Sequence, residues 1–120
     1  MSNHCLFIGS NLFFGDDNSN SPVPRMVEAR WLNLLERVGD CYYFDVEVDN
    51  DHGLVFADDA WLVALRLRLI ELGFSPEVAN KIQYSQEGLQ RYDYVHLYCN
   101  HPDFMNALRG CERFHEGGFE

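Results

Sequence analysis

Basic residues are scarce in this chain of 120 residues. It contains 9 Lys and Arg, of which Lys81 is the single lysine, against 19 Asp and Glu, and the formal net charge is −10. A protein that holds nucleic acid through its phosphates needs many Lys and Arg side chains to displace counterions. The charge balance therefore excludes a conventional nucleic-acid-binding domain.

Long apolar runs are also missing. The most apolar stretch, 60–72, is interrupted by Arg66, Arg68 and Glu71, whereas a membrane-spanning helix needs about 18 or more apolar residues in a row. The N-terminal residues lack the basic start and the apolar centre of a signal peptide. We therefore expect a cytoplasmic protein without a membrane segment.

Closely spaced cysteines and glycine-rich loops are absent as well. The chain has no Cys-x-x-Cys pair and no phosphate-binding glycine motif. Its C-terminal part does contain weak candidate zinc ligands: Cys99, His101, Cys111 and His115. Their spacing matches no strong zinc pattern, and nothing next to them marks a nucleophile. We expect reduced thiols, no metal, no cofactor and no catalysis, and keep a small zinc-binding or thiol enzyme as an alternative.

The chain does contain enough apolar material for one packed core. Hydrophobic residues make up 47% of it and aromatic residues 14%, which argues against intrinsic disorder. A single domain over 1–120 follows from this composition and length.

The N-terminal half predicts a strand, a loop, a helix and a hairpin. The apolar run 5–9 is typical of a buried strand. A cluster of turn formers predicts a long loop over 10–22, in which Phe13 and Phe14 either pair back on the first strand or present an apolar anchor. Apolar residues at three- and four-residue intervals predict an amphipathic helix over 24–38. Strict alternation predicts a strand over 42–49, with a turn and a partner strand at 54–56.

The C-terminal half predicts helices and one more strand. Asp58 or Asp59 caps a helix that ends at Gly73, and Pro76 opens a short helical turn. A loop follows over 85–90, and alternating tyrosines predict a strand over 92–99. Pro102 starts a last short helix, and the tail 116–120 is expected to fray.

This order of elements predicts an α+β fold. It corresponds to the ferredoxin-like βαββαβ arrangement, a four-stranded antiparallel sheet with two main helices on one face, plus short extra helices. In that arrangement the strand over 41–49 lies at an edge of the sheet, and the face without helices stays open to a partner.

Acidic residues are concentrated in one segment, which is the least random feature of the sequence. The 20 residues 40–59 contain seven acids and no Lys or Arg. Asp45, Glu47 and Asp49 alternate along a predicted strand, at a spacing of roughly 6.7 Å, which is close to the separation of successive DNA phosphates. We therefore predict that this segment forms a partner-binding surface, which also includes Asp51, Asp58 and Asp59. Tyr43 extends the row of carboxylates and is expected to be an aromatic anchor for the partner.

Two other interpretations of the acidic residues are weaker. Charges on an edge strand protect a protein from aggregation, but seven uncompensated charges exceed what solubility needs. The segment lacks the central glycine and the distal glutamate of a calcium-binding loop.

The predicted function follows from the charge. We expect an acidic inhibitor that binds a basic protein, one that handles nucleic acid, by charge mimicry. In size and acidic patterning the chain resembles the general class of anti-CRISPR and anti-restriction antagonists encoded by phages and plasmids. A toxin-neutralising immunity protein is the alternative with the same traits.

Overall fold

The computed structural model describes residues 4–14, 25–49, 59–85 and 94–116. Their elements are β1 (His4–Phe14), β2 (Arg25–Val38), β3 (Cys41–Asp49), α1 (Asp59–Leu72), α2 (Pro76–Ala79), β4 (Ile82–Tyr84), β5 (Tyr94–Asn100), α3 (Phe104–Arg109) and β6 (Phe114–Glu116). Among these helices, none is both long enough and apolar enough to cross a membrane.

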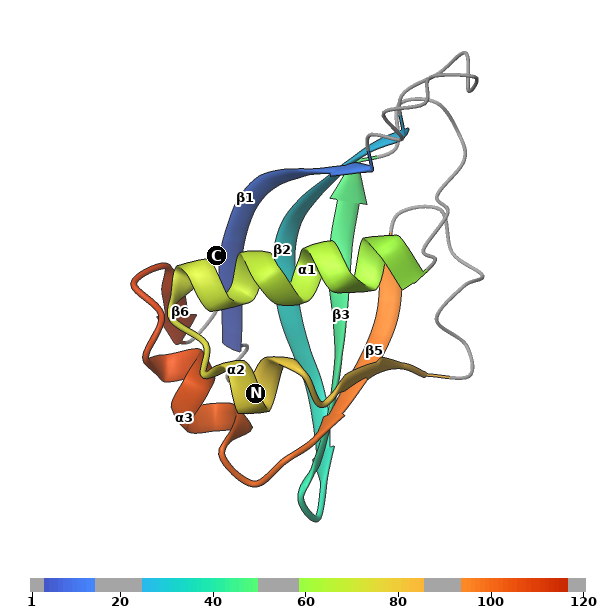
Figure 1. Cartoon of the computed structure of the whole chain (residues 1–120). Helices are drawn as coiled ribbons and strands as arrows, with labels where there is room; N and C mark the ends of the chain where they lie inside the picture. The colour runs from blue at the N-terminus through green and yellow to red at the C-terminus, as the bar shows by residue number, and fades with distance from the viewer. Residues whose placement is uncertain (1–3, 15–24, 50–58, 86–93, 117–120) are drawn as a thin grey trace.

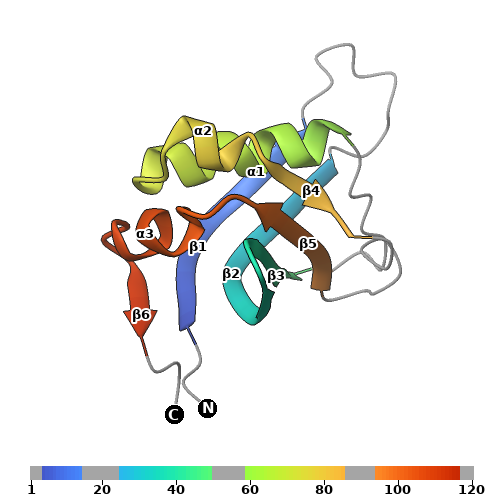
Figure 2. The same cartoon turned by 90° about the horizontal axis from the view of Figure 1, so that it is seen from below.

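The strands form one six-stranded sheet in the order β4-β5-β3-β2-β1-β6. Every neighbouring pair is antiparallel. Strands β1, β2 and β3 follow one another as a meander, and α1 then crosses the sheet (Figure 1). Figure 2 shows α1 and α2 stacked on one side of the strands. The phenyl ring of Phe104 on α3 contacts rings of the same buried cluster, so all three helices cover the same face.

The ferredoxin-like prediction is wrong. The sheet has six strands, not four, and the segment 24–38, expected as a helix, is the 14-residue strand β2. Strand β3, expected at an edge, lies in the interior of the sheet between β2 and β5.

Two β-bulges explain why β2 has the sequence pattern of a helix. In the register with β3, Arg30 is the extra residue between Ala29 and Trp31, and Leu35 is the extra residue between Leu34 and Glu36. Each bulge lengthens the spacing of residues on one face from two to three. Ala29 and Leu32, both fully buried, are therefore three apart on the helix-covered face. This spacing is the same as on one side of a helix.

The first strand is longer than its sequence suggests. Residues 10–14, predicted as the start of a loop, continue β1 and pair with β2 as far as Phe14 opposite Arg25. A bulge between Phe7 and Ser10 interrupts this pairing. Gly9 lies there at φ 55°. A Cβ atom at this position would lie 2.7 Å from the Phe7 ring, so the bulge needs glycine.

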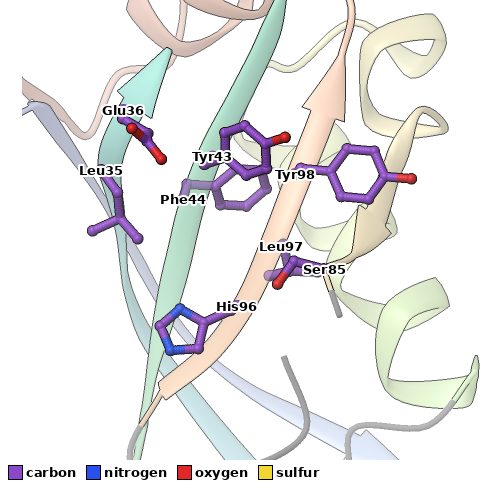
Figure 3. A pocket seen from close by; sticks show the side chains of 8 residues that line it. All are labelled: Leu35, Glu36, Tyr43, Phe44, Ser85, His96, Leu97 and Tyr98. Atoms are coloured by element: carbon purple, nitrogen blue, oxygen red, sulfur yellow. The ribbon is translucent and has the colours of Figure 1, made fainter. Parts of the chain in front are cut away.

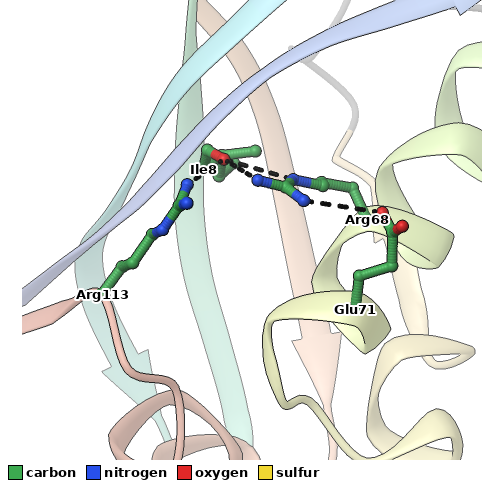
Figure 4. A network of polar contacts seen from close by, with 4 residues as sticks. All are labelled: Ile8, Arg68, Glu71 and Arg113. Atoms are coloured by element: carbon green, nitrogen blue, oxygen red, sulfur yellow. Dashed lines mark hydrogen bonds and ion pairs between the residues drawn. The ribbon is translucent and has the colours of Figure 1, made fainter.

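Two arginines hold this bulge from opposite directions. The carbonyl oxygen of Ile8 accepts hydrogen bonds from Arg68 Nη2 at 2.9 Å and from Arg113 Nη1 at 3.4 Å. Arg68 also lies 3.6 Å from Glu71 (Figure 4). Since Arg68 belongs to α1 and Arg113 precedes β6, this network connects two other parts of the chain to β1.

The core lies between the sheet and the helices. Phe104 of α3 is fully buried and stacks on Tyr42 and Phe44 at centroid distances of 5.1 and 5.2 Å. Its edge meets Phe74 at 5.8 Å. One ring thus joins α3 to β3 and to the end of α1.

The helix predicted to end at Gly73, the helical turn predicted to open at Pro76 and the short helix predicted to start at Pro102 are confirmed as α1, α2 and α3, of which α3 begins two residues later than predicted. The predicted strands over 42–49 and 92–99 are confirmed as β3 and β5, with small changes of boundary. The short strands β4 and β6 were not predicted. The turn and strand at 50–56, most of the loop at 85–90 and the tail 117–120 lie outside the described residues.

Candidate functional site

The helices leave one face of the sheet uncovered, and we call it the open face. Strand register places its residues in rows that run across neighbouring strands. One row contains Phe7, Trp31, Glu47 and Tyr94. A second contains Cys5, Asn33, Asp45 and His96. A third contains Glu36, Tyr43, Tyr98 and Gln83.

The first row is an aromatic platform with one carboxylate in it. Phe7 and Trp31 lie 4.8 Å apart between ring centroids, and His115 of β6 approaches Trp31 at 5.7 Å. The hydroxyl of Tyr94 lies 3.4 Å from Glu47 Oε1 and donates a hydrogen bond to it. Glu47 is half-buried, so its carboxylate is held in place but remains accessible.

The second row corrects the predicted role of Asp45. The sequence predicts a solvated carboxylate, but Asp45 is only 8% exposed. Asn33 on β2 donates a hydrogen bond from Nδ2 to Asp45 Oδ1 at 3.1 Å. Because β3 is an inner strand, side chains on both neighbouring strands surround this carboxylate. Asp45 therefore links β3 to β2 beneath the open face and is a poor contact residue for a partner.

Glu36, Tyr43 and Tyr98 of the third row line a groove of about 600 Å³ (Figure 3). Tyr43 and Tyr98 stand directly opposite each other, with ring centroids 6.2 Å apart and ring planes inclined by 39°. Glu36 is the partner of Tyr43 on β2 and is exposed. His96 and Ser85 complete the groove on the side of β5.

Polar neighbours raise the pKa of Tyr43. The principal cause is a hydrogen bond with the side chain of Cys41, and the charges of Cys41, Glu36 and Tyr98 and partial burial act in the same direction. The phenol therefore stays neutral over a wider pH range than usual. Its ring offers a neutral, electron-rich surface beside the Glu36 carboxylate.

The other predicted contact residues are not placed by the structure. The backbones of Asp49, Asp59, Phe13 and Phe14 lie in β3, α1 and β1, but their side chains are outside the described parts of the chain. Asp51 and Asp58 lie outside the described residues altogether. Of the predicted acidic surface, the open face thus contains Glu47 and Tyr43, with Asp45 beneath it.

The candidate zinc ligands are in separate environments. Cys99 donates to the Val78 carbonyl at 3.5 Å, and Cys111 donates to that of Ala107 at 3.3 Å. His101 Nδ1 accepts a hydrogen bond from the Asp103 amide at 3.0 Å, and His115 contacts Trp31. Within the described ranges, no group of three or more His, Cys, Asp or Glu side chains is arranged to hold a metal ion.

Burial determines the acidity of the thiols. All four cysteines are free of disulfides. Burial raises the pKa of Cys99 to about 12 and that of Cys111 to about 11. It raises the pKa of Cys5 as well. A thiol attacks as its thiolate, so these three buried groups are poor nucleophiles at neutral pH.

No family model, curated protein or solved structure gives a significant match to this chain. The open face is therefore the feature of the described residues from which a function can be inferred.

Sequence reasoning missed several residues of this face: Phe7, Trp31, Asn33, Glu36, His96 and Tyr98. The alternation of Tyr94, His96 and Tyr98 was visible in the sequence and places all three on one side of a strand. Which side is uncovered, and which residues of β3 and then β2 continue their rows, depends on the strand order.

Proposed function

We propose that this chain is a non-enzymatic binding protein, which docks the open face of its sheet onto a basic surface of another protein. It acts as an inhibitor, because the surface that it covers is one that otherwise holds nucleic acid. Its site of action is the cytoplasm, where free thiols are the normal state.

One observation carries this proposal. The three rows bring together rings, amides and three carboxylates, with no Lys or Arg at their register positions, and the guanidinium of Arg113 lies beside the Phe7 ring at 5.6 Å. Partly exposed Tyr and Trp side chains are enriched at protein interfaces, where they supply most of the binding energy. Accessible carboxylates beside them, at Glu36 and Glu47, favour a basic partner and speed its association.

Direct binding of nucleic acid by the same face is disfavoured. Sheets that bind single-stranded RNA do stack bases on exposed aromatic rings, so the rings alone do not decide the question. Glu36 and Glu47 lie beside these rings on the open face. They would repel phosphates, whereas a protein surface that binds phosphates would be attracted.

The mimicry differs from a simple row of phosphates. Asp45 is buried and hydrogen-bonded to Asn33. It therefore does not present an exposed charge next to that of Glu47, as a row of phosphates would. The negative charge of the face is spread over two rows, at Glu47 and Glu36. We infer that the face matches a basic surface by overall sign and by its rings.

Capture of the partner tests the proposal. The full chain is immobilised and exposed to a lysate of the source organism, beside two charge-reversal variants, Glu47→Lys on the open face and Glu77→Lys on α2. We expect wild type and Glu77→Lys to retain the same basic protein and Glu47→Lys to lose it. The purified partner should then release its nucleic acid when the wild-type chain is added.

Three results would overturn the proposal. Equal capture by both variants would remove the open face from the interface, and the exposed Val63 and Leu67 on α1 would be examined next. A captured toxin with no nucleic-acid site would identify a toxin-neutralising immunity protein. Stoichiometric zinc in the purified chain, without any partner, would support the zinc-binding alternative.

A further inference from the structure

The groove on the open face contains a carboxylate that forms no ion pair with the described residues. Glu36 is exposed, and the described residues provide no ion pair to it. Its neighbour Arg37 is directed away, since its guanidinium lies 5.3 Å from the Tyr42 ring and donates to the Gly39 carbonyl. The charge of Glu36 therefore remains available to a ligand in the groove.

Two aromatic rings adjoin this carboxylate. Tyr43 is the cross-strand partner of both Glu36 and Tyr98, so the three side chains form one continuous row. A cation is attracted to an aromatic face when it lies within about 6 Å of the ring centroid. With their centroids 6.2 Å apart, the two rings offer adjoining surfaces that one cation can contact together.

The combination of two rings and a carboxylate favours a guanidinium over an ammonium group. A guanidinium is planar, stacks on aromatic faces, is weakly hydrated and has several donors in a fixed fork. It can lie on the rings while it donates to the Glu36 carboxylate. An ammonium group is compact and strongly hydrated, so it gains less from two half-buried rings.

We propose that the groove bounded by Glu36, Tyr43 and Tyr98 is the subsite for one arginine side chain of the basic partner. This inference rests on the proposed function, because it names the chemical group that the open face recognises.

A matched pair of small probes tests the subsite without the partner. The full chain is titrated with N-acetyl-arginine methylamide and, separately, with its neutral isostere N-acetyl-citrulline methylamide, while NMR follows the Tyr43 and Tyr98 ring signals. We expect saturable shifts with the arginine probe only. The same shifts with the citrulline probe, or equally tight binding of N-acetyl-lysine methylamide, would overturn the proposal.

Variants separate the carboxylate from the rings. Glu36→Gln should weaken binding of the arginine probe about threefold, as expected for a partly exposed ion pair, while Glu112→Gln, an equal change outside the groove, should not. Tyr98→Phe keeps the ring and should bind normally, and Tyr98→Leu should bind about two- to fivefold more weakly. Unchanged affinity in Glu36→Gln contradicts the proposal even if Tyr98→Leu fails to fold.

Failure of this subsite is distinguishable from failure of the proposed function. If the arginine probe does not bind but Glu47→Lys still abolishes capture of the partner, the open face is the interface and only the arginine subsite is wrong. If the probe binds but capture is unaffected by Glu47→Lys, the function proposed for the open face is wrong.

Discussion

At the residue scale, the same side-chain type has different roles at neighbouring positions of one strand. Asp45 and Glu47 are two residues apart on β3 and face the same way. Asp45 is nearly inaccessible and bonded to Asn33, whereas Glu47 is half-buried and bonded to a tyrosine hydroxyl. Neighbours on β2 and β5 make this difference, so the alternation of acids does not by itself define a contact surface.

The cysteines give a residue-scale prediction. At pH 8 we expect iodoacetamide to modify Cys41, the half-buried thiol, well before Cys99 and Cys111, because burial keeps the latter two protonated. Mass spectrometry of peptides from the native and the unfolded protein measures the order. Equal rates for Cys41 and Cys99 in the native protein would contradict the burial seen here.

The same pKa shifts predict how stability depends on pH. Above the ordinary thiol pKa of 9.0 the unfolded chain loses protons that the folded chain keeps, up to about 12 for Cys99. The free energy of unfolding should therefore be unaffected by these thiols below pH 9 and fall above it, by up to about 1.4 kcal/mol per pH unit for each thiol. Denaturant titrations between pH 7 and pH 11 would show this, and Cys99→Ala should have a shallower dependence than wild type.

At the element scale, short elements are held by packing. Helix α3 has 6 residues, too few to be stable alone, and Phe104 attaches it to β3 and Phe74 by three ring contacts. Phe104→Ala should lower the free energy of unfolding by about 3–5 kcal/mol. Asn106→Ala, an exposed substitution in the same helix, should change it by less than about 0.5 kcal/mol. Denaturant unfolding followed by circular dichroism compares the two variants. If Phe104→Ala lowers the free energy of unfolding by less than about 1 kcal/mol, this ring is not what attaches α3 to the core.

At the scale of the whole molecule, the placement of charge matters as well as its sum. The net charge of −10 produces a long-range field that attracts any basic partner. Docking in one orientation depends instead on charges at the interface.

Two double variants of equal net charge separate these effects. Glu36→Gln/Glu47→Gln removes two charges from the open face, and Glu77→Gln/Glu112→Gln removes two elsewhere. We expect the first pair to slow association with the purified partner and to flatten its dependence on salt, and the second to behave nearly as wild type. Stopped-flow measurements at several salt concentrations give the association rate of each variant. If the rates of both double variants depend equally on salt, the attraction comes from net charge alone.

Local patterns in the sequence were sufficient for the elements whose form depends on nearby residues. Glycine and proline positions indicated the limits of α1, α2 and α3, and the two-residue period identified β3 and β5. The acidic charge and the interruption of the apolar stretch by Arg66 and Arg68 were equally plain. These properties come from composition and from contacts between residues close in the chain.

Pairing between distant segments decided the rest. The bulges at Arg30 and Leu35 exist only because β2 pairs with β3, and without that pairing the spacing of β2 favours a helix. Strands β4 and β6, of three residues each, depend on their neighbours β5 and β1. The row of Glu36, Tyr43 and Tyr98 comes from three strands. Tertiary structure alone brings it together, because a sheet takes its rows from hydrogen bonds between segments that the sequence separates.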